Sequence, residues 1–264
     1  MIDFIQWKVN PAILKTDSIE IRWYGLLFAL AFLVSYYIIK NMFKRENISQ
    51  DLLDKLTIYV GVGTVVGARL GHVLFYQPEY YAKHLLEVFQ IWKGGLASHG
   101  AAIGILVALW LFVRKYKKPY LWILDKIVIV VAISGAFVRL GNLMNSEIYG
   151  IPANIPWAFI FERTDPAMLP RHPTQIYEAL SYLLIFGILM YLYYKKETWK
   201  KQGYIFGIFL ILLFSARFFI EFIKDKQVDF EQTLPIDMGQ ILSIPFVLAG
   251  FYILFRSIKK YKTA

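Results

Sequence analysis

Three arginines lie inside or at the ends of long apolar segments of this sequence, at Arg69, Arg139 and Arg217. A charged side chain at bilayer depth costs about 2.5–3.5 kcal/mol on insertion scales, so each must face a polar interior or serve a function. The planar guanidinium donates two parallel charge-assisted hydrogen bonds to a phosphate. The arginines therefore predict a phosphate-binding site. For Arg69, in GARLGHVLFY, snorkelling toward headgroups is an equally good interpretation, and a headgroup contact is the alternative.

Arg139 belongs to a cluster of polar residues in the motif RLGNLMNSEIYG. Arg139 and Asn142 are three residues apart and share a helix face. A helix-end cap would explain Asn145, but it does not explain why Glu147 and the other three polar residues crowd the end of an apolar segment. The cluster therefore favours a functional site.

The motif RHPTQIYEAL places a second polar group at the start of a later apolar segment. Pro173 fits the first helical turn, where its missing donor is harmless. Gln175 and Glu178 then share one face, and His172 precedes them. Glu178 lies a full turn inside the segment, so it needs a cationic partner, which one of the two deep arginines could supply.

Arg217 and Glu221, in FSARFFIEF, are four residues apart on one predicted helix. They either form a self-compensated ion pair or hold the arginine ready for a phosphate. His99 lies in KGGLASHGAAIG, where flanking glycines leave room for another helix or a ligand. Because imidazole titrates near neutral pH, His99 is a candidate general base.

The elements that position these residues are predicted to be membrane helices. The chain has 264 residues, 58% of them hydrophobic, and a mean hydropathy of +0.48. A membrane span needs about 20 mostly apolar residues. Seven segments qualify, which predicts an all-α polytopic membrane protein: 20–39, 56–76, 95–113, 121–143, 174–194, 203–222 and 237–256.

Charge placement predicts the orientation of these spans. The net charge is +10, and the Lys and Arg residues cluster between spans, as expected for contact with anionic lipid headgroups rather than nucleic acid. The first, third and fifth connections and the C-terminal segment carry most of them, so the positive-inside rule places the N-terminus in the periplasm and the C-terminus in the cytoplasm. The sequence has no cysteine, so a thiol in the chemistry must belong to a substrate.

Two connections on the predicted periplasmic side are longer than a turn requires. Residues 77–94 mix aromatic and charged residues and predict an amphipathic interfacial helix. Residues 146–173 contain five prolines with aromatic residues between them and predict a small ordered cap with one or two strands. We expect the whole chain, 1–264, to form a single transmembrane domain.

The motifs GGLASHG, RLGNLMNSE with Gly150 after it, RHPTQIYEAL, ARFFIEF and DMGQILSIP resemble blocks of the prolipoprotein diacylglyceryl transferase family, in the same order. The resemblance covers nearly the whole chain. It implies a bacterial inner-membrane enzyme that moves the diacylglyceryl group of phosphatidylglycerol to the lipobox cysteine of a prolipoprotein and releases glycerol phosphate. It implies neither a cofactor nor a metal.

The resemblance and the residue patterns described above together assign expected roles to residues; Arg69, Asn145, His172 and Gln175 rest on the patterns alone. His99, Arg139, Arg217, Glu178 and Glu221 are expected to carry the reaction. Contacts with substrate are expected from a second set: Tyr24, Arg69, Asn142, Asn145, Glu147, His172 and Gln175. The family often has a tyrosine four positions before the arginine of the sixth span; this chain has Leu213 there, so that role is absent or another residue supplies it.

Two mechanisms and two other classes of protein remain open at this stage. His99 could take the proton of the attacking thiol, or the arginines alone could activate the thiol while His99 positions lipid. A carrier for an anionic solute would explain buried arginines but not the cap, and it would spread arginines across both leaflets. A non-catalytic lipid-binding scaffold is the third class.

Overall fold

The computed structural model describes residues 4–16, 19–91, 94–225 and 236–262. The chain divides into two compact units. The larger unit comprises Met1–Ile38 with Leu124–Ala264, and the smaller unit comprises Ile39–Ile123.

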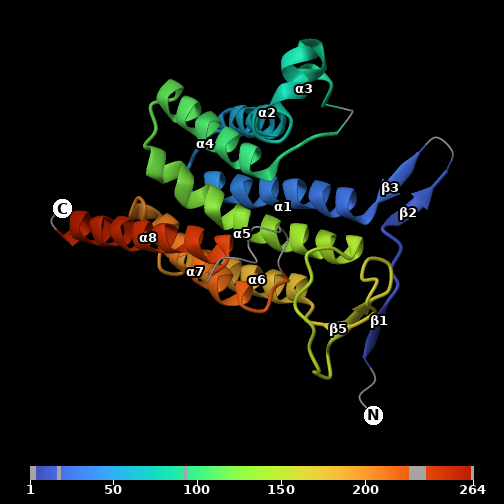
Figure 1. Cartoon of the computed structure of the whole chain (residues 1–264). Helices are drawn as coiled ribbons and strands as arrows, with labels where there is room; N and C mark the ends of the chain where they lie inside the picture. The colour runs from blue at the N-terminus through green and yellow to red at the C-terminus, as the bar shows by residue number, and fades with distance from the viewer. Residues whose placement is uncertain (1–3, 17–18, 92–93, 226–235, 263–264) are drawn as a thin grey trace. The chain divides into compact units, whose positions relative to one another are not determined.

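Seven helices of the described chain are long and apolar enough to cross a membrane, which confirms the predicted fold class (Figure 1). Several begin or end a few residues away from the predicted limits. The helix α1, for example, continues to Lys44 and Arg45, two cations that favour a helix C-terminus. The helices are α1 Trp23–Arg45, α2 Gln50–Phe75, α4 Ser98–Lys115, α5 Tyr120–Asn145, α6 Thr174–Tyr194, α7 Tyr204–Glu221 and α8 Met238–Lys262.

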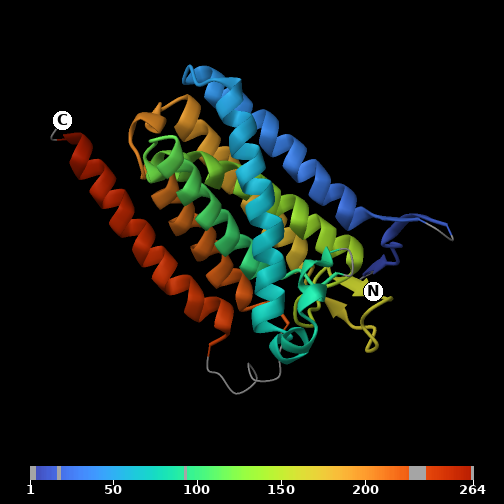
Figure 2. The ribbon, with the colours of Figure 1, turned by 90° about the horizontal axis from the view of Figure 1, so that it is seen from above.

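In the larger unit α7 packs along both α6 and α8, and Figure 2 shows the red α8 running beside the orange α7. A buried carboxylate fixes the start of α7. Asp125 of α5 is 2% exposed, and it accepts hydrogen bonds from the backbone N–H groups of Gly203 at 2.6 Å and Phe206 at 2.8 Å. Gly203 adopts a φ of +84°, which glycine tolerates without steric cost. Asp125 therefore joins α5 to α7 by capping otherwise unpaired donors.

In the smaller unit α2 and α4 approach closely along a ladder of glycines. A Cβ atom on Gly63 would lie 2.6 Å from Ala108 Cβ. A Cβ atom on Gly71 would lie 2.6 Å from Gly100 Cα. Small residues at such an interface let two membrane helices reach backbone contact, so side chains larger than hydrogen would force this pair apart.

The segment 77–94 is an arm built from two short helices, α3 Pro78–Lys83 and the 3₁₀ helix η1 Leu85–Phe89. The helical segment predicted here is divided in two, because His84, with φ −129° and ψ 56°, interrupts it. Residues 92–93 lie outside the described part. Leu86 is 80% exposed and Phe89 74% exposed; the place of the arm in the membrane interface stays a prediction.

The predicted cap, 146–173, contains the two short strands β4 Phe159–Phe161 and β5 Pro170–Arg171. A third strand, β1 Ile5–Trp7, pairs with β4 in parallel, while β5 pairs with β4 antiparallel. A further hairpin joins β2 Ala12–Lys15 to β3 Glu20–Arg22. The strands predicted in the cap are confirmed, whereas the three N-terminal strands were not anticipated. A 3₁₀ helix, η3 Thr198–Lys200, lies between α6 and α7.

Candidate functional site

The centre of the candidate site is an ion pair between α5 and α6. Arg139 Nε lies 3.1 Å from Glu178 Oε2, and the two side chains are 15% and 1% exposed. A buried carboxylate with no partner would be strongly destabilising, so the arginine that satisfies Glu178 is Arg139. Of the two arginines that the sequence offered as partners, the structure selects this one.

The polar residues around this pair form one hydrogen-bonded network. Arg139 Nη1 donates to Asn142 Oδ1 at 3.3 Å, and Asn142 Nδ2 donates to Glu147 Oε1 at 2.7 Å. Asn145 Nδ2 donates to the same carboxylate oxygen at 3.2 Å, and Gln175 Nε2 donates to the Glu147 carbonyl at 2.7 Å. The structure thus brings together five residues that the sequence singled out in two separate motifs.

Lys224 is a member of the site that sequence reasoning missed. Its Nζ atom lies 3.7 Å from Glu178 Oε1 and 3.7 Å from Glu221 Oε2, and the side chain is 8% exposed. The only sequence signal was its spacing of three residues from Glu221. Lys224 thus links the carboxylate of Glu178 on α6 to that of Glu221 on α7.

Main-chain pairing fixes the position of Lys224. Gly150 forms an isolated antiparallel bridge with Lys224, and Ile151 N donates to Ile223 O at 3.0 Å. A Cβ atom on Gly150 would lie 2.7 Å from His172 Cβ and closer still to Ile223 O. Only glycine fits at this crossing, so Gly150 holds the cap segment against the end of α7.

Arg217 of α7 is half-buried, and no ion pair or hydrogen bond joins it to any residue that the structure describes. The self-compensated pair with Glu221 is not formed, because Glu221 faces Lys224 instead. Arg217 does act electrostatically on the hydroxyl group of Tyr182, as does Arg139. The two deep arginines therefore share one neighbourhood, and none of the described residues takes a hydrogen bond from Arg217.

The charges in this neighbourhood are balanced. The cations are Arg139, Arg217 and Lys224, and the anions are Glu147, Glu178 and Glu221. Balance lowers the cost of holding so many charges in a membrane protein.

Tyr24 of α1 also lies at the site. Its ring packs on Gly141 of α5, where a Cβ atom would lie 2.7 Å from Tyr24 Cδ2. Glu147 and Arg139 both act electrostatically on its hydroxyl group. The sequence prediction that Tyr24 faces the same substrate as Arg139 is thus compatible with its position.

His172 is held beside the site by a backbone hydrogen bond and by the side chains of Tyr177 and Trp157. Its carbonyl accepts from Gly150 N at 2.9 Å. Its Nδ1 lies 3.2 Å from the Tyr177 hydroxyl, which accepts from Trp157 Nε1 at 2.8 Å. Burial lowers the pKa of His172, so the imidazole is neutral at pH 7.

Arg69 lies in the smaller unit, where main-chain oxygens surround it. Its guanidinium donates to the carbonyls of Val88 at 2.8 Å, Gly94 at 2.7 Å and Glu87 at 2.5 Å, and it lies 5.0 Å from the Tyr81 ring centroid. The residue is 4% exposed. These contacts make Arg69 the clamp that fastens the arm to α2.

His99 is the second residue of α4 and is exposed. The glycine after it, Gly100, packs against the α2 backbone at Gly71. This contact fixes the start of α4 and therefore the place of the imidazole within the smaller unit. The role of His99 as a base stays a prediction.

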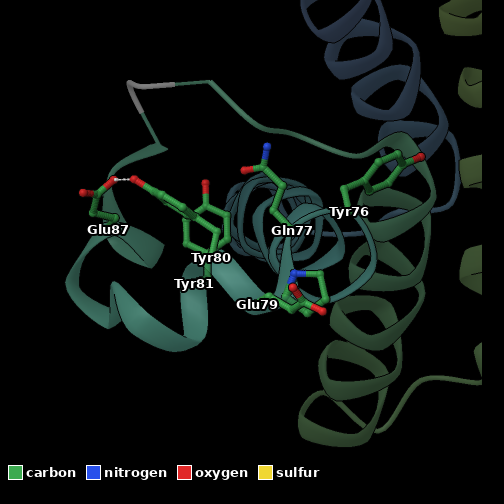
Figure 3. A pocket seen from close by; sticks show the side chains of 7 residues that line it. Tyr76, Gln77, Glu79, Tyr80, Tyr81 and Glu87 are labelled. Atoms are coloured by element: carbon green, nitrogen blue, oxygen red, sulfur yellow. Dashed lines mark hydrogen bonds between the residues drawn. The ribbon is translucent and has the colours of Figure 1, made fainter.

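The arm carries an open pocket of about 680 Å³, shown in Figure 3. Tyr80 donates a hydrogen bond to Glu87 Oε2 at 3.1 Å across it. The charged residues of its lining are both acidic, so the pocket is unsuited to a phosphate. It is lined by Tyr76, Gln77, Pro78, Glu79, Tyr80, Tyr81 and Glu87.

Seven membrane-length helices, together with a cluster of arginine, lysine and glutamate side chains in the larger unit, define a class of protein: a polytopic membrane protein with a polar cluster among its helices. The pattern of the prolipoprotein diacylglyceryl transferase family matches residues 11–256, and the chain belongs to that family.

Several named relatives are similar over almost their whole length. The phosphatidylglycerol–prolipoprotein diacylglyceryl transferase of Tolumonas auensis is 46% identical over 96% of this chain and 98% of its own. The proteins of the same name from Chloroherpeton thalassium and Porphyromonas gingivalis are each 45% identical over 97% of this chain, which covers 96% and 95% of their lengths. These matches favour the enzyme over the carrier and the scaffold.

Proposed function

We propose that this chain is a phosphatidylglycerol–prolipoprotein diacylglyceryl transferase. Membership of the family and the names of relatives that match end to end support this activity. The reaction joins the diacylglyceryl group to the thiol of the lipobox cysteine and releases glycerol phosphate. The chain supplies no thiol of its own, in keeping with a cysteine that arrives on the substrate.

The proposed location is the bacterial inner membrane, with the N-terminus in the periplasm and the C-terminus in the cytoplasm. The basic ends of α1, α4 and α8 support this orientation through the positive-inside rule. The candidate site then faces the outer leaflet, because it lies where α5 ends and α6 begins. A prolipoprotein whose signal helix crosses the membrane would present its cysteine at this depth.

The observation that carries the proposal is the pairing state of the two arginines. Arg139 is held by Glu178, whereas Arg217 has no anionic partner among the described residues. A phosphodiester adds one negative charge, which Arg217 can take with two parallel hydrogen bonds. Arg139 adds donors to the same group because both arginines lie beside Tyr182.

The chemical step follows from this placement. The thiolate sulfur attacks the glycerol carbon that bears the phosphate, and a carbon–sulfur bond forms. The carbon–oxygen bond breaks, and its electron pair stays on the leaving phosphate oxygen. Negative charge on that oxygen grows in the transition state, where Arg139 and Arg217 stabilise it in a partly dry site. The thiol proton passes to a base, for which His99 is the proposed residue.

The remaining site residues are proposed to hold the headgroup and the arginines. Lys224 and Glu221 position Glu178, which orients Arg139. One buried oxygen each of Gln175 and Asn145 has no hydrogen-bond donor among the described residues. The hydroxyl groups of a glycerol headgroup would supply donors to both. Asn142, Tyr24, Glu147 and His172 complete the proposed lining.

The direct test is a transfer assay with purified protein, phosphatidylglycerol vesicles and a peptide that contains a lipobox cysteine. We expect the peptide to gain the mass of one diacylglyceryl group and glycerol phosphate to appear in equal amount. A matched peptide with serine in place of the cysteine should gain nothing. Folded protein that modifies neither peptide would refute the proposal.

A further inference from the structure

A buried tyrosine lies where the two deep arginines meet. Tyr182 of α6 is 8% exposed. The Arg139 guanidinium, one turn away on the facing helix, interacts with its hydroxyl. Arg217 and Glu178 both act on the same hydroxyl electrostatically. A buried phenol hydroxyl costs free energy unless polar partners satisfy it, and the charged groups around Tyr182 are the partners available.

The packing of α5 against α6 prevents the ring of Tyr182 from rotating away from Arg139. Arg139 faces Glu178, and one turn further along each helix Gly135 faces Tyr182. A Cβ atom on Gly135 would lie 2.6 Å from Tyr182 Cδ2 and 2.9 Å from Cε2. The ring therefore lies directly on the α5 backbone, and its hydroxyl points along α5 toward the arginine that follows one turn later.

We infer that Tyr182 is a positioning residue for the transfer reaction, which aims the Arg139 guanidinium at the leaving phosphate. This inference rests on the proposed function. A guanidinium has five N–H donors, and Glu178, Asn142 and Tyr182 are its partners among the described residues. With three edges of the fork held, the remaining donors point in one direction.

Orientation should affect the transition state more than the bound substrate. The charge on the leaving oxygen is larger in the transition state, so a misaimed donor loses more there than in the ground state. Loss of the Tyr182 hydroxyl is therefore expected to lower kcat about tenfold and to change KM for phosphatidylglycerol less than about threefold. A purely structural residue would lower the thermal midpoint and leave kcat per folded molecule unchanged.

The primary experiment compares Tyr182→Phe with Tyr191→Phe, a substitution at an exposed tyrosine of the same helix. The first keeps the ring on Gly135 and removes only the hydroxyl. We expect the kcat loss for Tyr182→Phe alone. An unchanged kcat in Tyr182→Phe would overturn the inference, while wild-type protein without transfer activity would instead refute the proposed function.

A second pair of variants moves the ring without altering it. Gly135→Ala must displace Tyr182, whereas Gly187→Ala on α6 meets nothing within 4 Å. Gly135→Ala is expected to lower kcat, and Gly187→Ala is not. Should Tyr182→Phe be less stable than the wild type, kcat per folded molecule is measured in Tyr182→Phe, Arg139→Lys and the double variant. Non-additive losses support the inference, and additive losses contradict it.

Discussion

Two buried arginines, one in each unit, are held by opposite kinds of partner. Arg69 gives its donors to main-chain carbonyls of the arm, whereas Arg139 gives its donors to the side chains of Glu178 and Asn142. Main-chain oxygens carry no net charge and cannot leave without unfolding the arm. Side-chain partners can shift when an anion arrives. We infer that the kind of partner an arginine has, more than its depth, distinguishes an arginine that stabilises the fold from one that can bind a ligand.

Substitution of Arg139 should reduce the transfer rate more than any other change considered below. Arg139→Ala removes a preorganised cation from the leaving phosphate, and the transfer rate should fall about 10²–10³-fold. The thermal midpoint should change little, because Glu178 keeps Lys224 as a counter-ion. Mass spectrometry of the peptide product measures the rate. A variant that retained nearly the full rate would remove the phosphate-binding role of Arg139.

Substitution of Arg69 should instead lower stability more than the transfer rate. Arg69→Met leaves several carbonyls of the arm without their donor, and we expect the protein to lose about 3 kcal/mol of stability. Transfer per folded molecule should fall far less than in Arg139→Ala. Thermal unfolding in detergent measures the first effect. Full stability with abolished transfer would instead support the headgroup contact that the sequence suggested for Arg69.

Buried carboxylates extend the same comparison. Among the described residues, Asp125 accepts hydrogen bonds from backbone N–H groups, whereas Glu178 is paired with side-chain cations. Asp125→Ala removes the cap of α7 and should cost about 1–2 kcal/mol. Asp125→Asn keeps one acceptor oxygen and should cost less. Equal thermal midpoints for the wild type and Asp125→Ala would show that the cap contributes nothing.

The smallest expected effect is a pH dependence within the cap. Arg171 Nε lies 2.6 Å from Asp165 Oδ2, and Arg171 lowers the pKa of that carboxyl below its usual value. The ionised form is therefore favoured by folding. The resulting stability is present above the unfolded pKa, about 3.9, and is lost as the pH falls through the lowered pKa of the folded state.

This pH dependence is tested by comparing the wild type with Asp165→Asn. Between pH 7 and pH 3 the thermal midpoint of the wild type should fall further than that of the variant, since only the wild type has this carboxylate to protonate. The difference between the two falls isolates Asp165 from other carboxyl groups. Identical falls would mean that the pair with Arg171 does not stabilise the fold.

The sequence was sufficient for the features that single segments determine. Seven apolar runs of membrane length predicted seven helices, and a deep glutamate demanded a buried cation, which is Arg139. The five prolines of 146–173 correctly indicated an ordered cap with short strands. These features follow from the free-energy cost of exposing polar groups to lipid, which can be judged from the residues of each segment alone.

Features that depend on contacts between distant segments could not be predicted from the sequence. Lys224 enters the site because Gly150 pairs with it across the cap, and no local pattern announces that crossing. Tyr182 gains its position from a glycine on another helix. The strand β1 forms only because β4 offers an edge to pair with. The break at His84 likewise follows from the arm folding around Arg69 rather than from its hydrophobic pattern.

We propose above that Arg139 and Arg217 together bind the phosphodiester of phosphatidylglycerol. Phosphorus-31 NMR of this lipid, titrated into the protein in phosphatidylcholine nanodiscs, tests it most directly. We predict a shifted or broadened phosphorus signal with the wild type and with Arg256→Gln, which alters an exposed arginine of α8. The double variant Arg139→Gln/Arg217→Gln should leave the signal as it is in empty nanodiscs. An equal perturbation by that double variant would contradict the claim.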